Sequence, residues 1–479
     1  MPEAAATIVG NPTIASPIPQ RVAKPFVLPI PRGAAPFRFF VLGIAAAYLI
    51  FGRTFAYVGV TGLYPGEILL LVTSFGRYGW IRVYLANIRL RPALAGSIFL
   101  FLLWGCAEAA RGYMSGYPLL DIAKGLPTHY YPLLLFAGLS AGRFLTVARL
   151  KSYHLWLTIA TGIWGAATTI ILNRGDTTGL PWAPDVYIFS GSPIPPFCLL
   201  IYLSLSARLT WTFIMGCAPS VIALLIGGRA ALLGAVGGFG LLALRPKRLR
   251  FVAHLSILCL MTIAVWITFS GLLPDLGGRT GRATPTLIWA RLVTLVDPGE
   301  AALIVQGTDA DVSALMTDAG DADWRRDLWV ATIDSLGSTK DWIIGHGLGP
   351  VLGDLLPGAT GEGYGHDLRT PHNFAIYLLG YTGLIGCVLY LIVVLAVVIE
   401  IYRCPSSLVK DATLAAGASV VIMALAGNLL ETPFGAVPAY TSIGVLLAVA
   451  QRQPFRSYGL MNNASLRIAG NESEQVGNE

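Results

Sequence analysis

Two neighbouring residues, His372 and Asn373, stand where the longest apolar run of the chain begins, at residues 373–399. Thr370 and Pro371 precede them, which predicts a helix with Thr370 as its N-cap and Pro371 as its first residue. His372 would then lie in the first turn, at the edge of the membrane. Histidine titrates near neutral pH and can act as a general base there. The alternative is a histidine that only lies at the interface.

Three arginines could bind an anion such as a diphosphate. Arg229 stands in LLIGGRAALLGAVGG, at the expected external start of a membrane span, and helix N-termini bind phosphate. Arg325 and Arg326 lie in a stretch with helical spacing, 323–337. The alternatives are an interfacial anchor for Arg229 and a solvated or ion-paired double arginine for the other two.

The composition indicates what must position these residues. Of the 479 residues, 55% are hydrophobic and 12% are charged, whereas a soluble domain has about 25% charged residues. These values exclude a soluble enzyme, a disordered chain and a nucleic-acid binder. The six cysteines form no CxxC pair, and no His/Cys cluster predicts a metal or another cofactor. The chain is therefore expected to be an all-α polytopic membrane protein.

Twelve stretches are apolar enough to be membrane spans. They are 37–52, 65–83, 93–110, 130–147, 153–172, 193–207, 209–226, 229–244, 251–270, 373–399, 411–430 and 435–451.

The basic residues predict the orientation of these spans. With a cytoplasmic N-terminus, 21 of the 33 lysines and arginines fall in cytoplasmic segments, five in short external loops and seven in one long external loop. Cytoplasmic loops are enriched in Lys and Arg. Both termini are therefore expected in the cytoplasm.

The predicted organisation follows from the spans. A disordered cytoplasmic tail (1–36) leads into nine membrane helices (37–270), an external loop with helices (271–372), three further membrane helices (373–451) and a cytoplasmic tail (452–479). The loop contains 14 of the 26 acidic residues and is expected to cover the site.

The order of these features resembles the O-antigen ligase and polymerase superfamily of bacterial envelope glycosyltransferases. The family pattern HN-x9-GxxG is similar to His372-Asn373 followed by Gly383 and Gly386. Arg325 with Trp329 and the stretch IIGHGLG resembles the family's R-x3-W…GxGxG block. Arg229 matches the arginine at the start of a family membrane helix, although Gly228 and Ala230 replace the usual Ser and Gly. The resemblance covers about residues 200–470.

The resemblance implies a GT-C-like fold and a metal-independent transfer in the bacterial inner membrane. The donor would be a glycan on undecaprenyl diphosphate, and the acceptor a sugar hydroxyl, such as that of lipid A–core. Arg229 and Arg325 would bind the diphosphate, and His372 would be the catalytic base. Asn373, Arg326, Trp329, Gly383 and Gly386 would support them.

Several alternatives stay open. A repeat-unit polymerase of O-antigen or exopolysaccharide, or a protein O-glycosylating enzyme, would use the same residues, and the sequence does not identify the sugar. Either Arg325 or Arg326 could be the phosphate ligand. A lipid-linked glycan transporter is the alternative from another class; it would require ionisable residues in mid-span and repeated halves. A non-catalytic assembly protein is a further one.

Overall fold

The structure is a computed structural model of the chain. It describes residues 34–59, 63–170, 195–206, 217–221, 223–224, 229–245, 255–257, 260, 277–278, 281–282, 289–290, 293, 303–304, 325–355 and 370–452.

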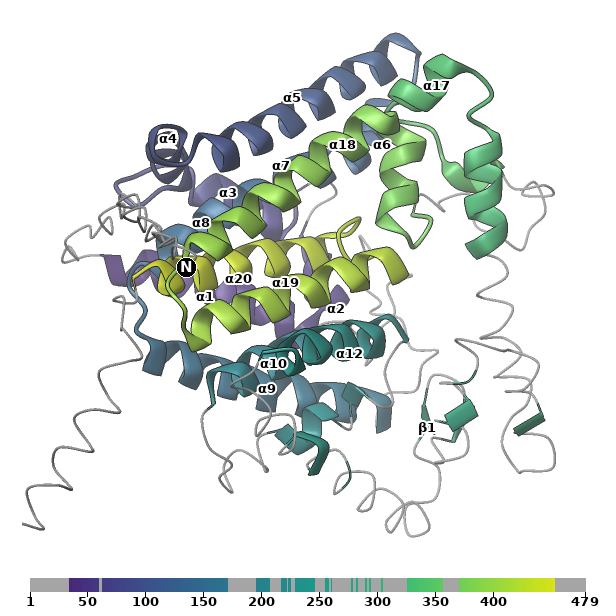
Figure 1. The fold of residues 1–479 in the computed structure, drawn as a ribbon. Helices are drawn as coiled ribbons and strands as arrows, with labels where there is room; N and C mark the ends of the chain where they lie inside the picture. Colours follow the sequence, from purple (N-terminus) through teal and green to yellow (C-terminus); the bar gives the residue numbers. More distant parts are fainter. Residues whose placement is uncertain are drawn as a thin grey trace, which may run out of the picture.

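The described part is almost entirely helical (Figure 1). The helices are α1 (Ala34–Phe51), α2 (Arg53–Ala56), α3 (Pro65–Val72), α4 (Trp80–Leu90), α5 (Pro92–Met114), α6 (Leu119–Gly125), α7 (Pro127–Tyr130), α8 (Leu134–Gly142), α9 (Val147–Ile170), α10 (Pro195–Leu205), α12 (Arg229–Ala243), α17 (Thr339–Ile344), α18 (Phe374–Arg403), α19 (Leu408–Ala426) and α20 (Pro433–Gln451), with the 3-10 turns η1 (Tyr131–Leu133) and η3 (Leu352–Leu355). Residues 325–334 are also helical. The strands β1 (Gly277–Gly278) and β2 (Gly281–Arg282) form one antiparallel pair.

Four helices of the described part are long and apolar enough to cross a membrane: Pro92–Met114, Phe374–Arg403, Leu408–Leu425 and Pro433–Gln451. They coincide with four of the predicted spans and support the expectation of an all-helical membrane protein. The count of twelve spans stays a prediction. Most of 209–226 and 251–270, both terminal tails and much of 271–372 lie outside the described residues.

One predicted span has a different local structure. The stretch 65–83 contains two helices, α3 and α4, separated by a turn at residues 73–79. Gly76 has a φ of +90° in this turn, a conformation that glycine adopts without steric penalty. The glycines in SFGRYG therefore end the first helix before it reaches the length of a full span.

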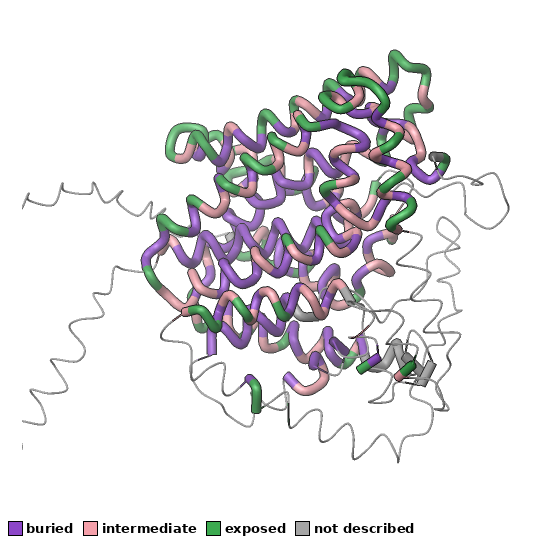
Figure 2. Tube along the Cα trace, turned by 45° about the vertical axis from the view of Figure 1, so that its right-hand side comes forward, coloured by how far each residue is buried: buried purple, intermediate pink, exposed green. Residues whose placement is uncertain are grey.

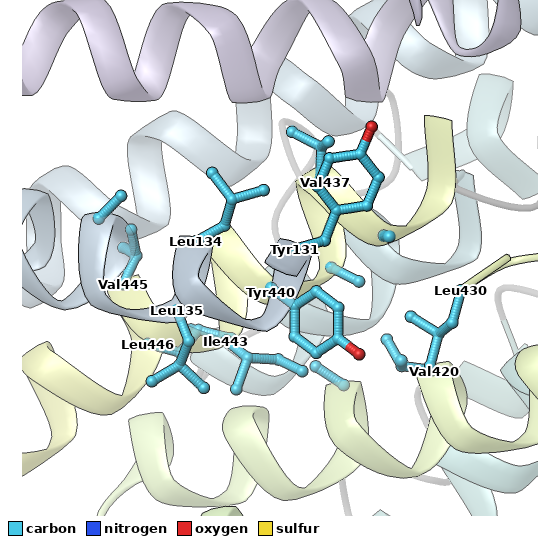
Figure 3. Close-up of a cluster of buried hydrophobic side chains, with 14 of the residues drawn as sticks. Tyr131, Leu134, Leu135, Val420, Leu430, Val437, Tyr440, Ile443, Val445 and Leu446 are labelled. Carbon is cyan, nitrogen blue, oxygen red and sulfur yellow. The ribbon is translucent and has the colours of Figure 1, made fainter. Parts of the chain in front are cut away.

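The core is centred on α20. Of the apolar stretch in α20, 94% is buried, against 28% for α18. Helix α8 packs closely on α20 because glycines line the contact: a Cβ at Gly138 would lie 2.1 Å from the carbonyl oxygen of Thr441. Figure 3 shows the apolar side chains that fill this interface, among them Leu134, Leu135, Val437 and Ile443.

The outer helices expose a large apolar surface. Buried residues concentrate in the central layer, whereas α5 and α18 alternate between buried and exposed residues (Figure 2). The exposed apolar side chains on these two helices are Phe99, Leu100, Leu103, Leu384, Val388, Leu391, Ile392, Leu395 and Ile399. A surface of this kind is typical of contact with lipid.

Helix α18 is broken at Gly383. Its φ of +64° and ψ of −169° are not helical, and they divide α18 into a first part (374–382) and a second part (384–403). The two parts meet at a sharp angle beside α17 (Figure 1). The first part has nine residues and is too short to cross a bilayer by itself, because a span needs about 20 residues. His372 and Asn373 directly precede this short part.

Candidate functional site

His372 has a backbone conformation that side-chain-bearing residues rarely adopt. Its φ is +56°, and no other non-glycine residue in the described ranges has a positive φ. This left-handed conformation costs an ordinary residue about 1–2 kcal/mol, so the surrounding contacts must hold it. Strain of this type concentrates at functional sites. The residue predicted as a general base is therefore also the residue with the strained backbone.

The N-cap of α18 is Asn373. Its side-chain oxygen accepts hydrogen bonds from two N–H groups of the first turn, at 3.0 and 3.3 Å. The predicted cap at Thr370 and the predicted first helical residue, Pro371, are therefore wrong, since the left-handed backbone of His372 prevents a helix from continuing through it. His372 lies just before the first turn, at the positive end of the helix dipole.

Trp329, from the segment that precedes α17, contacts the same turn. Its indole Nε1 donates a hydrogen bond of 2.6 Å to the carbonyl oxygen of Pro371. Trp329 belongs to the helix 325–334, so the predicted helix at 323–337 is confirmed over that range. This helix packs closely on the first part of α18, because a Cβ at Gly380 would lie 2.9 Å from the methyl group of Thr332.

Glu431, in the turn between α19 and α20, is the residue of this site that sequence reasoning missed. Both of its carboxylate oxygens are buried, and neither completes a hydrogen bond of normal geometry within the described residues. Burial raises the pKa of the Glu431 carboxyl well above its usual value. The backbone N–H groups of His372 and Asn373 and the charge of Arg325 act in the opposite direction. These groups therefore surround one carboxyl.

The two neighbouring arginines differ in their surroundings. Arg325 is partly buried and interacts electrostatically with Glu431. Arg326 is exposed and pairs with the adjacent Asp327, with 3.7 Å between Nε and Oδ1 and side-chain exposures of 68% and 63%. An exposed pair of this type contributes little to stability. Arg325 is therefore the arginine that acts on Glu431, whereas Arg326 is exposed.

Arg229 is the first residue of α12, as the sequence predicted. Its side chain lies outside the described part. The neighbouring Ala230 shows where the start of α12 lies. It packs against Gly427, since a Cβ at Gly427 would lie 3.2 Å from the Cβ of Ala230. Gly427 is the C-cap of α19 and stands four residues before Glu431. The start of α12 therefore lies at the same end of the bundle as Glu431.

Gly383 and Gly386, the two glycines of the GxxG pattern, belong to the break in α18. A Cβ at Gly383 would lie 2.3 Å from the carbonyl oxygen of Ile343, and one at Gly386 would overlap the Thr382 hydroxyl. A side chain at Gly383 would therefore prevent the close approach of the end of α17, and one at Gly386 would clash with the preceding turn of α18. This contact sets the direction of the first part of α18.

The role of Glu431 had only a weak signal in the sequence. A carboxylate in a short turn between two spans is common at helix ends, and nothing in the sequence relates position 431 to position 372.

Among the described residues, no group of three His, Cys, Asp or Glu side chains could hold a metal ion. The acidic residues between 309 and 323 lie outside that part of the chain.

The combined arrangement is suited to acid–base chemistry next to an anion. A histidine, a carboxyl group and a guanidinium meet at the N-terminus of a short helix, where the dipole favours negative charge. No model of a known protein family matches the chain. No curated protein matches it either. The function must therefore be argued from the site.

Proposed function

We propose that this protein is an inner-membrane glycosyltransferase that moves a glycan from undecaprenyl diphosphate to an acceptor sugar hydroxyl, as an O-antigen ligase does with lipid A–core. One observation carries the proposal. The strained His372 stands at a helix N-terminus, and the buried Glu431 carboxyl is acted on by the N–H groups of His372 and Asn373 and by the charge of Arg325. A base and a cation beside an anion-binding helix end are the groups that this reaction requires.

The donor diphosphate is assigned to the N-terminal end of the first part of α18. The positive end of the helix dipole attracts phosphate oxygens there. Arg325 supplies a guanidinium, whose forked donors match phosphate. Arg229 at the start of α12 is the proposed second clamp, and the nearness of Ala230 to Gly427 supports this role.

The acceptor hydroxyl is assigned to His372. The hydroxyl oxygen attacks the anomeric carbon of the donor glycan, and the bond from that carbon to the diphosphate oxygen breaks. The hydroxyl proton moves to the imidazole of His372, and undecaprenyl diphosphate leaves with the electron pair of the broken bond. A general base in this role contributes about 10²–10⁴-fold to the rate.

Glu431 is proposed to stabilise the turn at His372. Its buried carboxyl faces the N–H groups of His372 and Asn373 and the charge of Arg325. Electrostatic attraction between a carboxyl group and nearby N–H groups and a guanidinium is stronger in a buried site than in water. Glu431 therefore connects the base and the cation through one side chain.

Two observations support the proposed membrane position: the apolar outer surface and the basic residues at the opposite end of the bundle. Helix α18 runs from Phe374 to Arg403, and Arg403 and Arg91 both pair with Glu400, at 2.7 and 3.1 Å. At that end Arg452 also donates to the carbonyl oxygen of Gly142, over 2.7 Å. Basic residues mark the cytoplasmic side. The proposed topology thus has twelve spans, cytoplasmic termini and an external His372.

Buried carboxyl groups favour transferase over transporter. Glu67 lies in the first turn of α3, Glu400 in the last turn of α18, and Glu431 in a turn between helices. Glu108 lies six residues before the end of α5 and pairs with Arg111. Transporters commonly carry ionisable residues near the middle of their spans, whereas these four carboxyl groups lie nearer to helix ends.

The proposal is tested with purified protein in proteoliposomes that contain an undecaprenyl-diphosphate-linked glycan and an acceptor glycolipid. Wild-type protein should release undecaprenyl diphosphate and form the longer glycan. Arg325→Ala and Arg229→Ala should abolish transfer, whereas Arg326→Ala should retain it. Active Arg325→Ala together with inactive Arg326→Ala would reassign the phosphate ligand.

The acceptor is identified from the envelope glycans of a deletion strain. Loss of core-attached chains, with full-length chains accumulating on the lipid carrier, indicates a ligase. Chains that stop at one repeat unit indicate a polymerase. An unchanged glycan profile and no transfer in proteoliposomes would contradict the proposed function as a whole.

A further inference from the structure

Two side chains on one face of α5, Trp104 and Arg111, contact the break in α18 or the loop that crosses it, and Glu108 on the same face pairs with Arg111. Trp104, Glu108 and Arg111 are separated by four and three residues, so they lie on the same side of the helix. They stand outside every pattern that the sequence analysis used. The function proposed above assigns them no role.

Arg111 joins α5 to the end of α17. Its Nη1 donates to the carbonyl oxygen of Gly345 over 2.9 Å, and its Nη2 donates to that of Ile344 over 2.6 Å. Its Nε donates to Glu108 over 2.8 Å, and Nη2 also contacts this carboxylate. The Glu108 side chain is only 2% exposed. The carboxylate therefore fixes the guanidinium, and the guanidinium caps the last carbonyl groups of α17.

The loop after α17 replaces hydrogen bonds that the break in α18 removes. The N–H groups of His346 and Gly347 donate to the carbonyl oxygens of Gly380 and Tyr381, at 2.8 and 2.9 Å. The Nε1 of Trp104 donates a hydrogen bond of 3.2 Å to the next carbonyl oxygen, that of Thr382. Three successive carbonyl groups at the end of the first part of α18 are thus satisfied from outside the helix.

This contact leaves no room for side chains between the two backbones. Gly345 has a φ of +66°, and a Cβ on it would lie 2.6 Å from the backbone nitrogen of Gly383. Gly347 has a φ of +87°, and its Cβ would lie 3.3 Å from the Arg111 guanidinium. The loop backbone therefore lies between Arg111 and the broken helix, and a shift of one would move the other.

We infer that Arg111 is a positioning residue that sets the angle of the first part of α18 and so places His372 and Asn373. Glu108 orients its guanidinium, and Trp104 supports the same break. The effect on transfer rests on the proposed function, while the effect on the backbone stands without it. A displacement of about 1 Å at a reacting group can reduce a rate by about a hundredfold.

The test compares Arg111→Gln, Arg111→Lys and Trp104→Phe with wild-type protein in lipid nanodiscs. Lys124→Gln is the matched control, because Lys124 lies in α6, is 41% exposed and pairs with Asp121 at 3.8 Å. Two properties are measured: amide hydrogen exchange over residues 344–349 and 370–383, and the kcat and KM of transfer.

Arg111→Gln should speed exchange in both segments by about tenfold and leave other helices unchanged. Its kcat should fall by at least about tenfold with an unchanged KM for the donor. Trp104→Phe should show a smaller change of the same kind, and Arg111→Lys should recover part of the loss. Lys124→Gln should behave as wild type.

Two results would overturn the inference. One is wild-type exchange in 344–349 and 370–383 for Arg111→Gln. The other is a lower kcat in Arg111→Gln with exchange spread evenly over all helices, which indicates a general loss of stability. If Arg111→Gln does not fold, Trp104→Phe decides by the same criteria. If wild-type protein transfers no glycan, the proposed function fails, and the exchange data alone decide whether Arg111 holds the break.

Discussion

The indole nitrogen of Trp329 lies 2.6 Å from the carbonyl oxygen of Pro371, which is 42 residues further along the chain. This hydrogen bond joins the helix 325–334 to the turn that precedes α18. Because Pro371 is followed by His372, whose φ is +56°, the bond acts directly on the strained residue. Arg325 is one helical turn before Trp329, so the same helix brings the cation to the site.

Trp329→Phe keeps an aromatic ring and removes the donor to Pro371. We expect transfer to fall by about tenfold, while the free energy of unfolding changes by about 0.5–1.5 kcal/mol, the net contribution of one hydrogen bond. Trp342→Phe is the control, since Trp342 is 38% exposed and belongs to α17. Equal losses of activity in both variants would show that the Pro371 contact has no special role.

His372→Gly should be more stable than His372→Ala by about 1 kcal/mol, because glycine adopts a positive φ without the clash of a Cβ. Neither variant should transfer glycan. Thermal unfolding in detergent or nanodiscs measures the difference. As a control, Ala375→Gly in the first turn of α18 should lower stability, since glycine weakens a regular helix. A His372→Gly variant less stable than His372→Ala would contradict the strained turn.

Glu431→Gln should make stability less dependent on pH. Burial raises the pKa of Glu431 in the folded state, so the folded protein holds this proton at a higher pH than the unfolded chain does. In the wild type this group favours folding below the unfolded pKa, about 4.3, and the contribution is lost as pH rises toward the folded pKa. Relative to wild type, Glu431→Gln should therefore gain stability as pH rises through this window.

The control for this prediction is the exposed Asp354, since Asp354→Asn should leave the pH dependence of unfolding unchanged. Thermal unfolding between pH 4 and pH 8 measures both variants. Parallel curves for wild type and Glu431→Gln would mean that the carboxyl has the same proton affinity in the folded and unfolded states.

The sequence predicted the long helices better than the local structure at His372. The apolar runs located α5, α18, α19 and α20 because a membrane span needs a continuous apolar stretch. The cap at Asn373 could not be predicted, because the choice between Thr370 and Asn373 depends on the φ of His372. That angle is held by Trp329 and Glu431, which are distant in sequence.

The break in α18 shows the same limit. Gly383 and Gly386 are visible in the sequence, but glycines are also common in unbroken membrane helices. Gly383 has a positive φ because the loop after α17 lies against it and supplies its N–H groups to Gly380 and Tyr381. A contact between two backbones requires small residues but no particular side chain, so it is difficult to predict from the sequence.

The proposed orientation predicts which positions an impermeant reagent can reach. In a cysteine-free background, Lys340→Cys in α17 should react with an impermeant maleimide in intact spheroplasts. Arg89→Cys in α4 should react only after lysis. Both native side chains are exposed, so a lack of reaction would reflect the side of the membrane. The reverse pattern would contradict the orientation that the basic residues predict.

The most direct test of the central claim measures transfer and donor binding on the same His372→Gln protein. Reconstituted wild-type protein should transfer glycan from undecaprenyl diphosphate to a sugar acceptor. His372→Gln should bind the donor with an unchanged Kd and transfer at least about a hundredfold more slowly, since glutamine keeps hydrogen bonds but cannot take the proton. Transfer by His372→Gln near the wild-type rate would contradict the assignment of His372 as the base.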